Sequence, residues 1–338
     1  MTKDEYKEQL RKTIANNTTS PMTRSDIETC YQYIDRLYTA GLPVFFDEKH
    51  VRIALRLHGI DLNSYHTFPL SQFGKIRIIT APSLLLKERQ RWILTNILSK
   101  IPVSPYAHGF EPGCSIKTNA MLHANNNYAL CLDIKDFFPS IPQSAVVEIF
   151  HSMGYSVKAS NMLATLCCFQ GALPQGAPTS PKLSNIFCKD LDMELSKIAE
   201  EESVTYSRYA DDITFSGTHS LERVFRKAKI TLRKYGFSLN EAKIHFYGPE
   251  TPKRITGLLV QKGTVRVPKH FKRLLKQEIY YCNKYGVLTH LENIGATKFI
   301  NYREHLYGKA YYVYMIEPEE GKMFLEQLGE IEWPGFLN

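Results

Sequence analysis

Two adjacent aspartates, Asp211 and Asp212, are the residues most able to do chemistry in this sequence. They end the tetrapeptide Tyr209-Ala210-Asp211-Asp212, and β-branched or aromatic residues recur at every second position on both sides of it. This spacing predicts a β-hairpin with the acidic pair at its tip. Adjacent carboxylates repel each other, whereas Mg²⁺ binds hard oxygen ligands, often one or two carboxylates together with substrate phosphates. Since Asp-Asp in a solvated turn is also common, the rest of the chain must decide.

A third carboxylate, Asp133, lies near the end of the apolar run Tyr128–Ile134, which is typical of a short buried strand. A carboxylate at the end of such a strand is costly unless it pairs with a cation or binds one. We therefore expect Asp133 to be the third oxygen donor beside Asp211 and Asp212.

The composition is that of a globular protein with two or three domains or subdomains. The 338 residues are 43% hydrophobic and 22% charged, and 42 Lys and Arg against 34 Asp and Glu give a net charge of +8. A mild basic excess suits a polyanionic partner without identifying it. The seven cysteines show no zinc spacing, the N-terminus is charged, and no apolar run approaches the ~18 residues of a membrane span. We expect a soluble cytoplasmic protein with reduced thiols and no membrane partner.

The distribution of charge is more informative than its sum. Residues 253–284 hold nine basic side chains against one acid, whereas residues 317–332 hold six acids against one lysine. A nucleic-acid backbone would be attracted by the first stretch and repelled by the second. The acidic stretch is either a solvated face or a protein-binding segment.

Tyr65–Pro82 reads as a second hairpin, with Lys75 and Arg77 on one face of its second strand. Two such cations can hold a triphosphate, although an exposed edge strand also carries lysines to discourage aggregation. Asn119 and His123 are four residues apart and would share one helical face. A lone histidine at such a position is more often structural than a ligand.

The loop Leu173–Pro181 (LPQGAPTSP) leads into a predicted helix. Its Gly176 would let a ligand approach the backbone closely, and the helix N-terminus that follows favours negative charge. A simple Pro-rich connection is the alternative. Phosphoryl transfer uses two metal ions about 3.5–4 Å apart, and three carboxylates from neighbouring strands can hold them.

In their order along the chain, these elements resemble the reverse transcriptases over roughly residues 65–315. The resemblance implies an α+β right-hand polymerase fold, with fingers, an antiparallel palm sheet backed by helices, and a short helical thumb. Leu132–Ile141 resembles the first catalytic motif, Leu173–Pro181 the second and Tyr209–Asp212 the third. It implies that Asp133, Asp211 and Asp212 hold two Mg²⁺ ions. The residues it assigns to the incoming deoxynucleoside triphosphate are Lys75, Arg77, Phe138 as the sugar gate, Gln175, Gly176 and Lys243.

Within that class the chain resembles the retron reverse transcriptases. Asn119-Ala120-Met121-Leu122-His123 fits their Asn-Ala-x-x-His signature, and Ile255-Thr256-Gly257 fits their Val-Thr-Gly with Ile for Val. The resemblance implies that the enzyme copies part of a structured noncoding RNA into attached single-stranded DNA. It also implies priming from a guanosine 2′-hydroxyl and a role in anti-phage defence with a separate effector protein. The side chains expected to contact nucleic acid are Asn119, His123, Lys253, Arg254, Lys269, Lys272, Arg273 and Lys276.

The expected segments are an N-terminal helical extension (1–64), fingers (65–127), palm (128–262, with a fingers insertion near 145–172), and thumb with the C-terminal segment (263–338). Two other reverse transcriptase types, group II intron and diversity-generating enzymes, remain alternatives. A non-catalytic RNA-binding scaffold with a palm fold is an alternative from a different class. An RNA polymerase of the same design is disfavoured by the bulk of Phe138.

Overall fold

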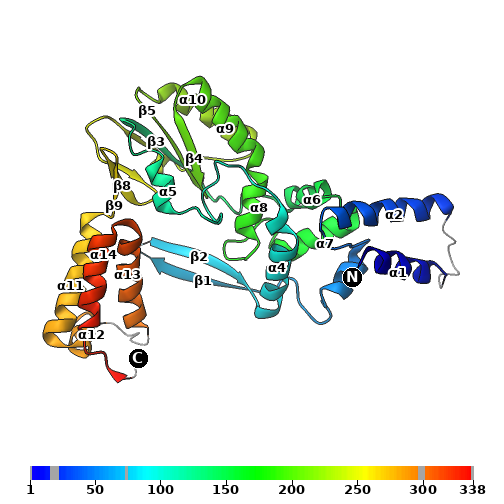
Figure 1. The fold of residues 1–338 in the computed structure, drawn as a ribbon, viewed down its shortest axis with the longest axis horizontal. Helices are drawn as coiled ribbons and strands as arrows, with labels where there is room; N and C mark the ends of the chain where they lie inside the picture. Colours follow the sequence, from blue (N-terminus) through cyan, green and yellow to red (C-terminus); the bar gives the residue numbers. More distant parts are fainter. Residues whose placement is uncertain (1, 16–22, 73–74, 296–300, 336–338) are drawn as a thin grey trace. The chain divides into compact units, whose positions relative to one another are not determined.

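Figure 1 shows a computed structural model of the chain, which describes residues 2–15, 23–72, 75–295 and 301–335. The chain divides into two compact units, and each unit is assembled from three separate segments. The first unit comprises residues 1–110, 134–195 and 230–239, and the second comprises residues 111–133, 196–229 and 240–338. The expected division into extension, fingers, palm and thumb stays a prediction.

The first unit begins with the helices α1 (Lys3–Ala15), α2 (Arg24–Thr39) and α3 (Glu48–Ala54). A capping box starts α2, because the Thr23 hydroxyl accepts from Asp26 N and the Asp26 carboxylate accepts from Thr23 N. The inner face of α2 is fully buried, and its aromatic neighbour Phe45 stacks on Tyr155 at a ring distance of 6.0 Å. The N-terminal segment is therefore helical and packed, as its apolar spacing predicts.

The predicted cationic hairpin is present as β1 (Tyr65–Gln72) and β2 (Lys75–Pro82), which pair antiparallel along their whole length. Since side chains alternate along a strand, Arg77 lies on one face of β2 and Ile76 and Ile78 lie on the other. These two isoleucines are 73% and 55% exposed. The hairpin therefore leaves apolar side chains uncovered on the face opposite Arg77.

The rest of the first unit is helical, with α4 (Leu84–Asn96), η1 (Leu98–Lys100), α6 (Gln143–Ser152), α7 (Val157–Cys167) and α8 (Ser180–Phe187). Two further helices, α9 (Lys189–Glu201) and α10 (Glu222–Lys234), each contain residues of both units. Gln90 of α4 is fully buried and donates to Tyr65 Oη at 2.9 Å and to Leu166 O at 2.8 Å. This side chain ties the base of the hairpin to α4 and α7.

A four-stranded antiparallel sheet of order β4-β5-β3-β6 lies in the second unit. Its strands are β3 (Tyr128–Asp133), β4 (Thr205–Tyr209), β5 (Asp212–Gly217) and β6 (His245–Tyr247). The central strands β3 and β5 are largely buried, as the apolar run that ends in Asp133 predicts. The short helix α5 (Ile116–Met121) contacts β4, and η2 (Glu241–Lys243) precedes β6.

A second sheet and a group of helices complete this unit. The strands are β7 (Lys253–Ile255), β8 (Leu258–Gln261) and β9 (Thr264–Arg266), and the helices are α11 (Lys269–Tyr285), α12 (Val287–Asn293), α13 (Tyr302–Ile316) and α14 (Pro318–Gly329). They share a continuous buried apolar core with α5. A Cβ on Gly321 would lie 2.1 Å from the Cα of Tyr314. Only glycine therefore permits the close packing of α14 on α13.

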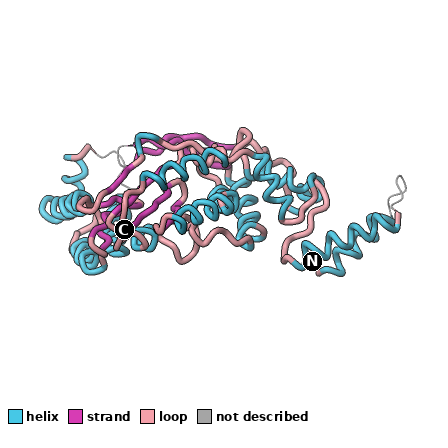
Figure 2. Tube along the Cα trace, turned by 90° about the horizontal axis from the view of Figure 1, so that it is seen from above, coloured by secondary structure: helices cyan, strands magenta, loops and turns pink. Residues whose placement is uncertain are grey.

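Helices and antiparallel strands are mixed along the chain (Figure 2), which confirms the predicted α+β class. The seven cysteines are free thiols, four of them buried. Among the described residues, no helix combines the length and apolar character that a membrane crossing requires.

Candidate active site

The acidic pair lies at the tip of the β4–β5 hairpin, where its flanking pattern places it. Tyr209 pairs with Asp212, so Ala210 and Asp211 are the two turn residues. Ala210 has a φ of +57°, in the left-handed region, at the turn position where a type II′ hairpin normally uses glycine. A left-handed conformation costs a non-glycine residue roughly 1–2 kcal/mol. Backbone strain of this kind is typical of functional sites.

Arg208 supports this strained turn, although it was not among the residues predicted from the sequence. It is fully buried, and its Nη1 donates to the Ala210 carbonyl oxygen at 3.1 Å. A buried guanidinium is costly without hydrogen bonds, so its use at this position is structural. The available signal was a single charged residue, Arg208, in a predicted strand that is otherwise uncharged, directly before the Tyr-Ala-Asp-Asp motif.

Asp133 ends β3 directly opposite Asp212 of β5. Residues paired in this way have side chains on the same face, with Cβ atoms about 4.5–5.5 Å apart. Asp133 is only 6% exposed. Because like charges directly opposite each other destabilise a sheet, a cation beside this pair of carboxylates would stabilise it.

Lys243 places such a cation next to Asp133. Its Nζ lies 2.5 Å from Asp133 Oδ2, and the start of its short helix η2 is held by Asn240 N, which donates to Asp133 O at 2.9 Å. The Lys243 side chain is 43% exposed, so it neutralises the carboxylate without sealing it from solvent. The nucleotide-binding role predicted for Lys243 stays a prediction.

The donor set fits a divalent metal ion. Asp133, Asp211 and Asp212 offer only hard oxygen ligands, which Mg²⁺ prefers, and the Lys243 ammonium shows that positive charge is favourable beside Asp133. Over the residues that the structure describes, no three His, Cys, Asp or Glu side chains are grouped closely enough to hold a metal. A metal held here by one or two of these carboxylates would take its remaining ligands from substrate phosphates and water.

Asn119 and His123 are internal residues. They are 1% and 0% exposed, and both ring nitrogens of His123 are hydrogen-bonded to serines of the acidic hairpin. Both amide atoms of Asn119 are buried without a hydrogen-bond partner among the described residues. The expectation that these side chains contact nucleic acid is therefore wrong for this structure, because neither has surface to offer.

Among the predicted nucleotide contacts, Arg77 is exposed on β2, whereas the side chain of Lys75 lies outside the described part of the chain. Phe138 is half-buried, with its ring 6.2 Å from that of Phe110. Gln175 uses its carbonyl oxygen to accept from Thr80 N at 2.8 Å. The loop that contains Gln175 therefore docks on β2, the strand that carries Arg77.

Gly176 has a φ of +138°, and a Cβ at this position would lie 2.8 Å from Thr80 O and 3.0 Å from Ile79 Cγ2. The close approach predicted at this glycine is thus made by the chain's own hairpin. The expectation that Gly176 lets a ligand approach its backbone is therefore corrected, because Thr80 and Ile79 occupy that space.

The predicted basic surface is partly internal. Arg254, Lys269, Arg273 and Lys276 are exposed. Lys253 is 3% exposed, and burial lowers the pKa of its ammonium. A side chain so covered is not available to a phosphate backbone, so the expectation of a direct contact by Lys253 is wrong here.

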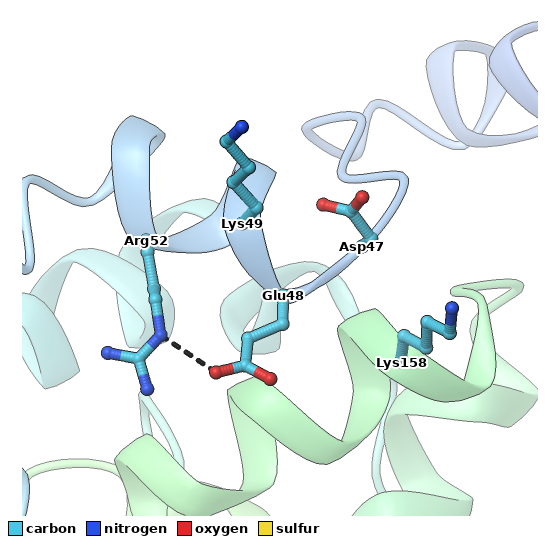
Figure 3. Close-up of a pocket in the computed structure, with 5 residues that line it drawn as sticks. All are labelled: Asp47, Glu48, Lys49, Arg52 and Lys158. Carbon is cyan, nitrogen blue, oxygen red and sulfur yellow. Dashed lines mark hydrogen bonds and ion pairs between the residues drawn. The ribbon is translucent and has the colours of Figure 1, made fainter. Parts of the chain in front are cut away.

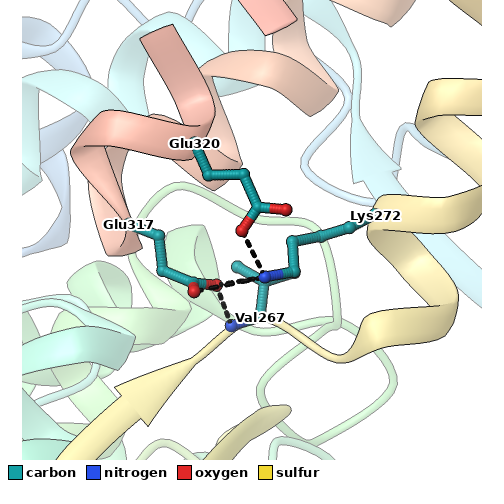
Figure 4. A network of polar contacts seen from close by, with 4 residues as sticks. All are labelled: Val267, Lys272, Glu317 and Glu320. Atoms are coloured by element: carbon teal, nitrogen blue, oxygen red, sulfur yellow. Dashed lines mark hydrogen bonds and ion pairs between the residues drawn. The ribbon is translucent and has the colours of Figure 1, made fainter. Parts of the chain in front are cut away.

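Lys272 is held by acids of the C-terminal stretch (Figure 4). Its Nζ lies 3.0 Å from Glu317 Oε1 and 2.5 Å from Glu320 Oε2, and Glu317 Oε1 also accepts from Val267 N at 2.8 Å. Burial lowers the pKa of Lys272, but the hydrogen bonds to Glu320 and Glu317 outweigh burial and leave it raised. The predicted nucleic-acid contact by Lys272 is therefore corrected to an internal ion pair.

An open hollow of about 290 Å³ in the first unit is lined by Asp47, Glu48, Lys49, Arg52 and Lys158 (Figure 3). Its acids already have partners. Asp47 Oδ1 accepts from His50 N at 2.8 Å as the cap of α3, and Glu48 pairs with Arg52 at 2.8 Å. Nothing in this hollow assembles the donor set of a polymerase.

The chain is similar to known reverse transcriptases. The family model described as "Reverse transcriptase (RNA-dependent DNA polymerase)" matches residues 68–266. The chain is 34% identical over 273 residues to the Retron Ec86 reverse transcriptase of Escherichia coli, with 76% of this chain and 85% of that protein covered. Identity to the Retron Mx162 reverse transcriptase of Myxococcus xanthus is 33% over 294 residues, covering 77% and 59%. The chain is 34% identical over 318 residues to the Retron Mx65 reverse transcriptase of the same organism, with 83% of this chain and 71% of that protein covered.

Proposed function

Since this chain belongs to the retron reverse transcriptases and is therefore an RNA-directed DNA polymerase, we propose that it copies part of its own structured noncoding RNA into single-stranded DNA. Synthesis starts at a guanosine 2′-hydroxyl within that RNA, so the DNA stays covalently joined to it. Family membership implies an RNA template, deoxynucleoside triphosphates and a divalent metal, and it confirms the predicted polymerase fold. The priming mode and the choice of RNA are proposals.

The observation that carries the catalytic proposal is the pairing of Asp133 with Asp212 across β3 and β5. It brings carboxylates 79 positions apart in the sequence (212 minus 133) onto one face of the sheet, next to the Asp211 turn. Repulsion between these carboxylates would only destabilise a hairpin with a purely structural role. A bound divalent cation would offset the repulsion.

In the proposed reaction, the primer hydroxyl gives its proton to solvent water and its oxygen bonds to the α-phosphorus of the nucleotide. The bond from that phosphorus to the bridging oxygen breaks, and pyrophosphate leaves with the bonding electron pair. Two Mg²⁺ ions held by Asp133, Asp211 and Asp212 would supply Lewis-acid stabilisation of the attacking and leaving oxygens. Before substrate binds, the Lys243 ammonium compensates the negative charge of the Asp133 carboxylate. Freed from Asp133, its exposed ammonium would be available to the triphosphate, as the sequence predicts for this residue.

Substrate selection is assigned to residues of the first unit. Arg77, exposed on β2, compensates triphosphate charge. Gln175, in the loop docked on the same strand through Thr80, positions the nucleotide. Phe138, half-buried against Phe110, excludes a ribose 2′-hydroxyl by its bulk.

Helix α11 offers a surface for the nucleic-acid backbone. Exposed side chains recur on it every three or four residues and therefore share one face, namely Lys269, Arg273, Lys276, Tyr280 and Lys284. Lys284 Nζ lies 5.4 Å from the centre of the Tyr280 ring. Cations in such a row follow phosphates, and an exposed tyrosine among them can stack on a base.

The direct test is to purify the protein from cells that express it with the DNA flanking its gene, and to sequence the bound nucleic acid. RNA and DNA joined through a 2′-linked guanosine support the proposal. Unbranched DNA, or RNA alone beside an active polymerase, contradicts the priming mode. Asp212→Asn is the matched variant, because it keeps the size of the side chain and removes the charge, and it should yield RNA without DNA.

The proposal extends to anti-phage defence with a separate effector protein, acting in the cytoplasm. Support for this part is the retron family alone. Phage plating on cells that carry the whole locus, compared with the Asp212→Asn locus, tests it. Equal plaque counts on wild-type and empty-vector cells for a broad phage panel would contradict the defence role.

A further inference from the structure

A buried polar network joins the two strands of the acidic hairpin. His123, which follows α5, is 0% exposed, with Nδ1 2.6 Å from Ser216 Oγ and Nε2 2.8 Å from Ser207 Oγ. Asn126 Nδ2 donates to the same Ser216 Oγ at 2.8 Å and to Thr205 Oγ1 at 3.3 Å. The imidazole and the amide thus each bridge β4 to β5.

We propose that His123 is a positioning residue for catalysis. Its ring sets how β4 lies against β5, and thereby where Asp211 and Asp212 stand relative to Asp133. This inference rests on the metal-binding role proposed above for the three aspartates. It also gives a physical role to the histidine of the Asn-Ala-x-x-His motif, which has no surface for RNA.

The network and the carboxylates share one face of the sheet. Side chains alternate along a strand, so Asp212 and Ser216 project from the same face of β5. The pairing register places Ser207 of β4 and Asp133 of β3 on that face as well. His123 therefore hydrogen-bonds to the hairpin on the face from which Asp133 and Asp212 project. Its partner Ser207 is only two residues before Tyr209, close to the turn.

The backbone ladder alone holds β4 weakly. Among the strands that the structure describes, β4 is at the sheet edge and pairs with β5 alone, and paired strands can twist relative to each other over a wide range. At the tip, adjacent carboxylates repel each other and Ala210 is held at a φ of +57°. Both features favour a change in the conformation of the turn. A fixed contact between the two strands close to the tip opposes that relaxation.

The imidazole is suited to this task. Neutral histidine donates from one ring nitrogen and accepts at the other, and a serine hydroxyl can do either. One rigid ring therefore satisfies Ser207 and Ser216 together and fixes the distance between their oxygens. Since the site is buried, water does not compete for these hydrogen bonds.

The test compares His123→Ala with His290→Ala. His290 is also buried, at 5% exposure, and its ring makes one hydrogen bond, to Tyr302 Oη at 3.1 Å, among helices remote in sequence from the hairpin. Both variants lose a buried imidazole. Each is measured for melting temperature, RNA affinity, kcat and KM for deoxynucleotides on a synthetic RNA template with a DNA primer, and the MgCl₂ concentration that gives half-maximal activity.

We expect His123→Ala to lower kcat by about tenfold or more, since misplacing a catalytic group by about 1 Å has effects of this size. The MgCl₂ requirement should rise several-fold, while RNA affinity and nucleotide KM stay within about twofold of wild type. His290→Ala should lose stability without a change in the MgCl₂ requirement. If both variants show the same kcat and the same MgCl₂ requirement at a temperature where both are folded, His123 is merely structural and the inference is overturned.

A milder pair covers the case in which His123→Ala does not fold. Ser207→Ala removes only the hydrogen bond between the His123 ring and β4. Ser160→Ala is its control, because the equally buried Ser160 hydroxyl has no partner among the described residues. A higher MgCl₂ requirement for Ser207→Ala alone supports the inference, and equal requirements overturn it. Asp212→Asn in the same assay separates the two proposals, since full activity of that variant would overturn the metal assignment itself.

Discussion

Replacing Gly176 by alanine tests how the Gln175-Gly176 loop is held against the β1–β2 hairpin. An added Cβ would lie 2.8 Å from Thr80 O and 3.0 Å from Ile79 Cγ2, and the residue has a φ of +138°. Backbone atoms supply the closest contact, so no side-chain rotation relieves it. The loop must move away from β2, and the hydrogen bond from Thr80 N to Gln175 O must lengthen from 2.8 Å.

The expected loss follows from these two effects. A non-glycine residue in a sparsely populated backbone region costs about 1–3 kcal/mol, and weakening the Thr80–Gln175 hydrogen bond removes up to about 0.5–1.5 kcal/mol. Together they lower the free energy of unfolding by about 1.5–4.5 kcal/mol. At about 2–4 °C per kcal/mol for a folding unit of about 150–250 residues, the melting temperature of the first unit should fall by roughly 3–18 °C.

Thermal unfolding and primer extension with varied deoxynucleotide concentration measure the two consequences. Gly171→Ala is the control, since Gly171 also has a positive φ, +81°, but no heavy atom lies within 4 Å of its added Cβ. It should lose about 1–2 kcal/mol and keep its nucleotide KM. Gly176→Ala should lose more stability and raise the KM several-fold. A Gly176→Ala protein that melts no lower than Gly171→Ala, with unchanged KM, would refute the reasoning from the close approach.

Three further outcomes are expected. Phe138→Ala should relax sugar selection, so that single-nucleotide incorporation of ribonucleotides rises relative to deoxynucleotides; unchanged selectivity would contradict the gate assignment. Arg273→Ala should reduce the slope of log RNA affinity against log salt concentration by about one. Lys253→Met should leave that slope unchanged, because Lys253 is 3% exposed. Equal slopes for the two variants would contradict this expectation. Hydrogen bonds to Glu320 and Glu317 raise the pKa of Lys272 above 10.5 despite burial, so its stabilising contribution is present below about that pH and is lost as pH rises through the raised pKa. The melting temperatures of wild type and Lys272→Met should therefore converge at alkaline pH, and a constant difference would count against the ion pair.

Local patterns accounted for much of the fold and for the centre of the site. Alternation around Tyr209–Asp212 predicted the two strands of a hairpin, the apolar run that contains Asp133 predicted a third strand, and all three are present. Their side-chain periodicity is a property of a few consecutive residues, so no tertiary information was needed. That Asp133 lies near Asp212 was expected only from the order of motifs along the chain, and the antiparallel register places the two residues opposite each other on neighbouring strands.

Accessibility could not be predicted in the same way. His123, Lys253 and Lys272 are polar residues that suggested nucleic-acid contacts, yet the first two are buried and the third is held by acids 45 and 48 residues later. Whether a polar side chain faces solvent depends on elements packed over it from distant segments. A sequence pattern records the period of a helix or strand but not what covers it.

The sequence alone established which residue types stand in which local elements: an acidic hairpin tip, a strand that ends in a carboxylate, and a helix with a basic row. Tertiary structure decided which of these groups meet, namely Lys243 with Asp133, His123 with Ser207 and Ser216, and Gly176 with Thr80. The physical reason is the distance along the sequence over which each effect acts. Backbone propensity and side-chain period act over a few residues, whereas hydrogen bonds, ion pairs and burial depend on atoms that only the folded chain brings within a few ångströms.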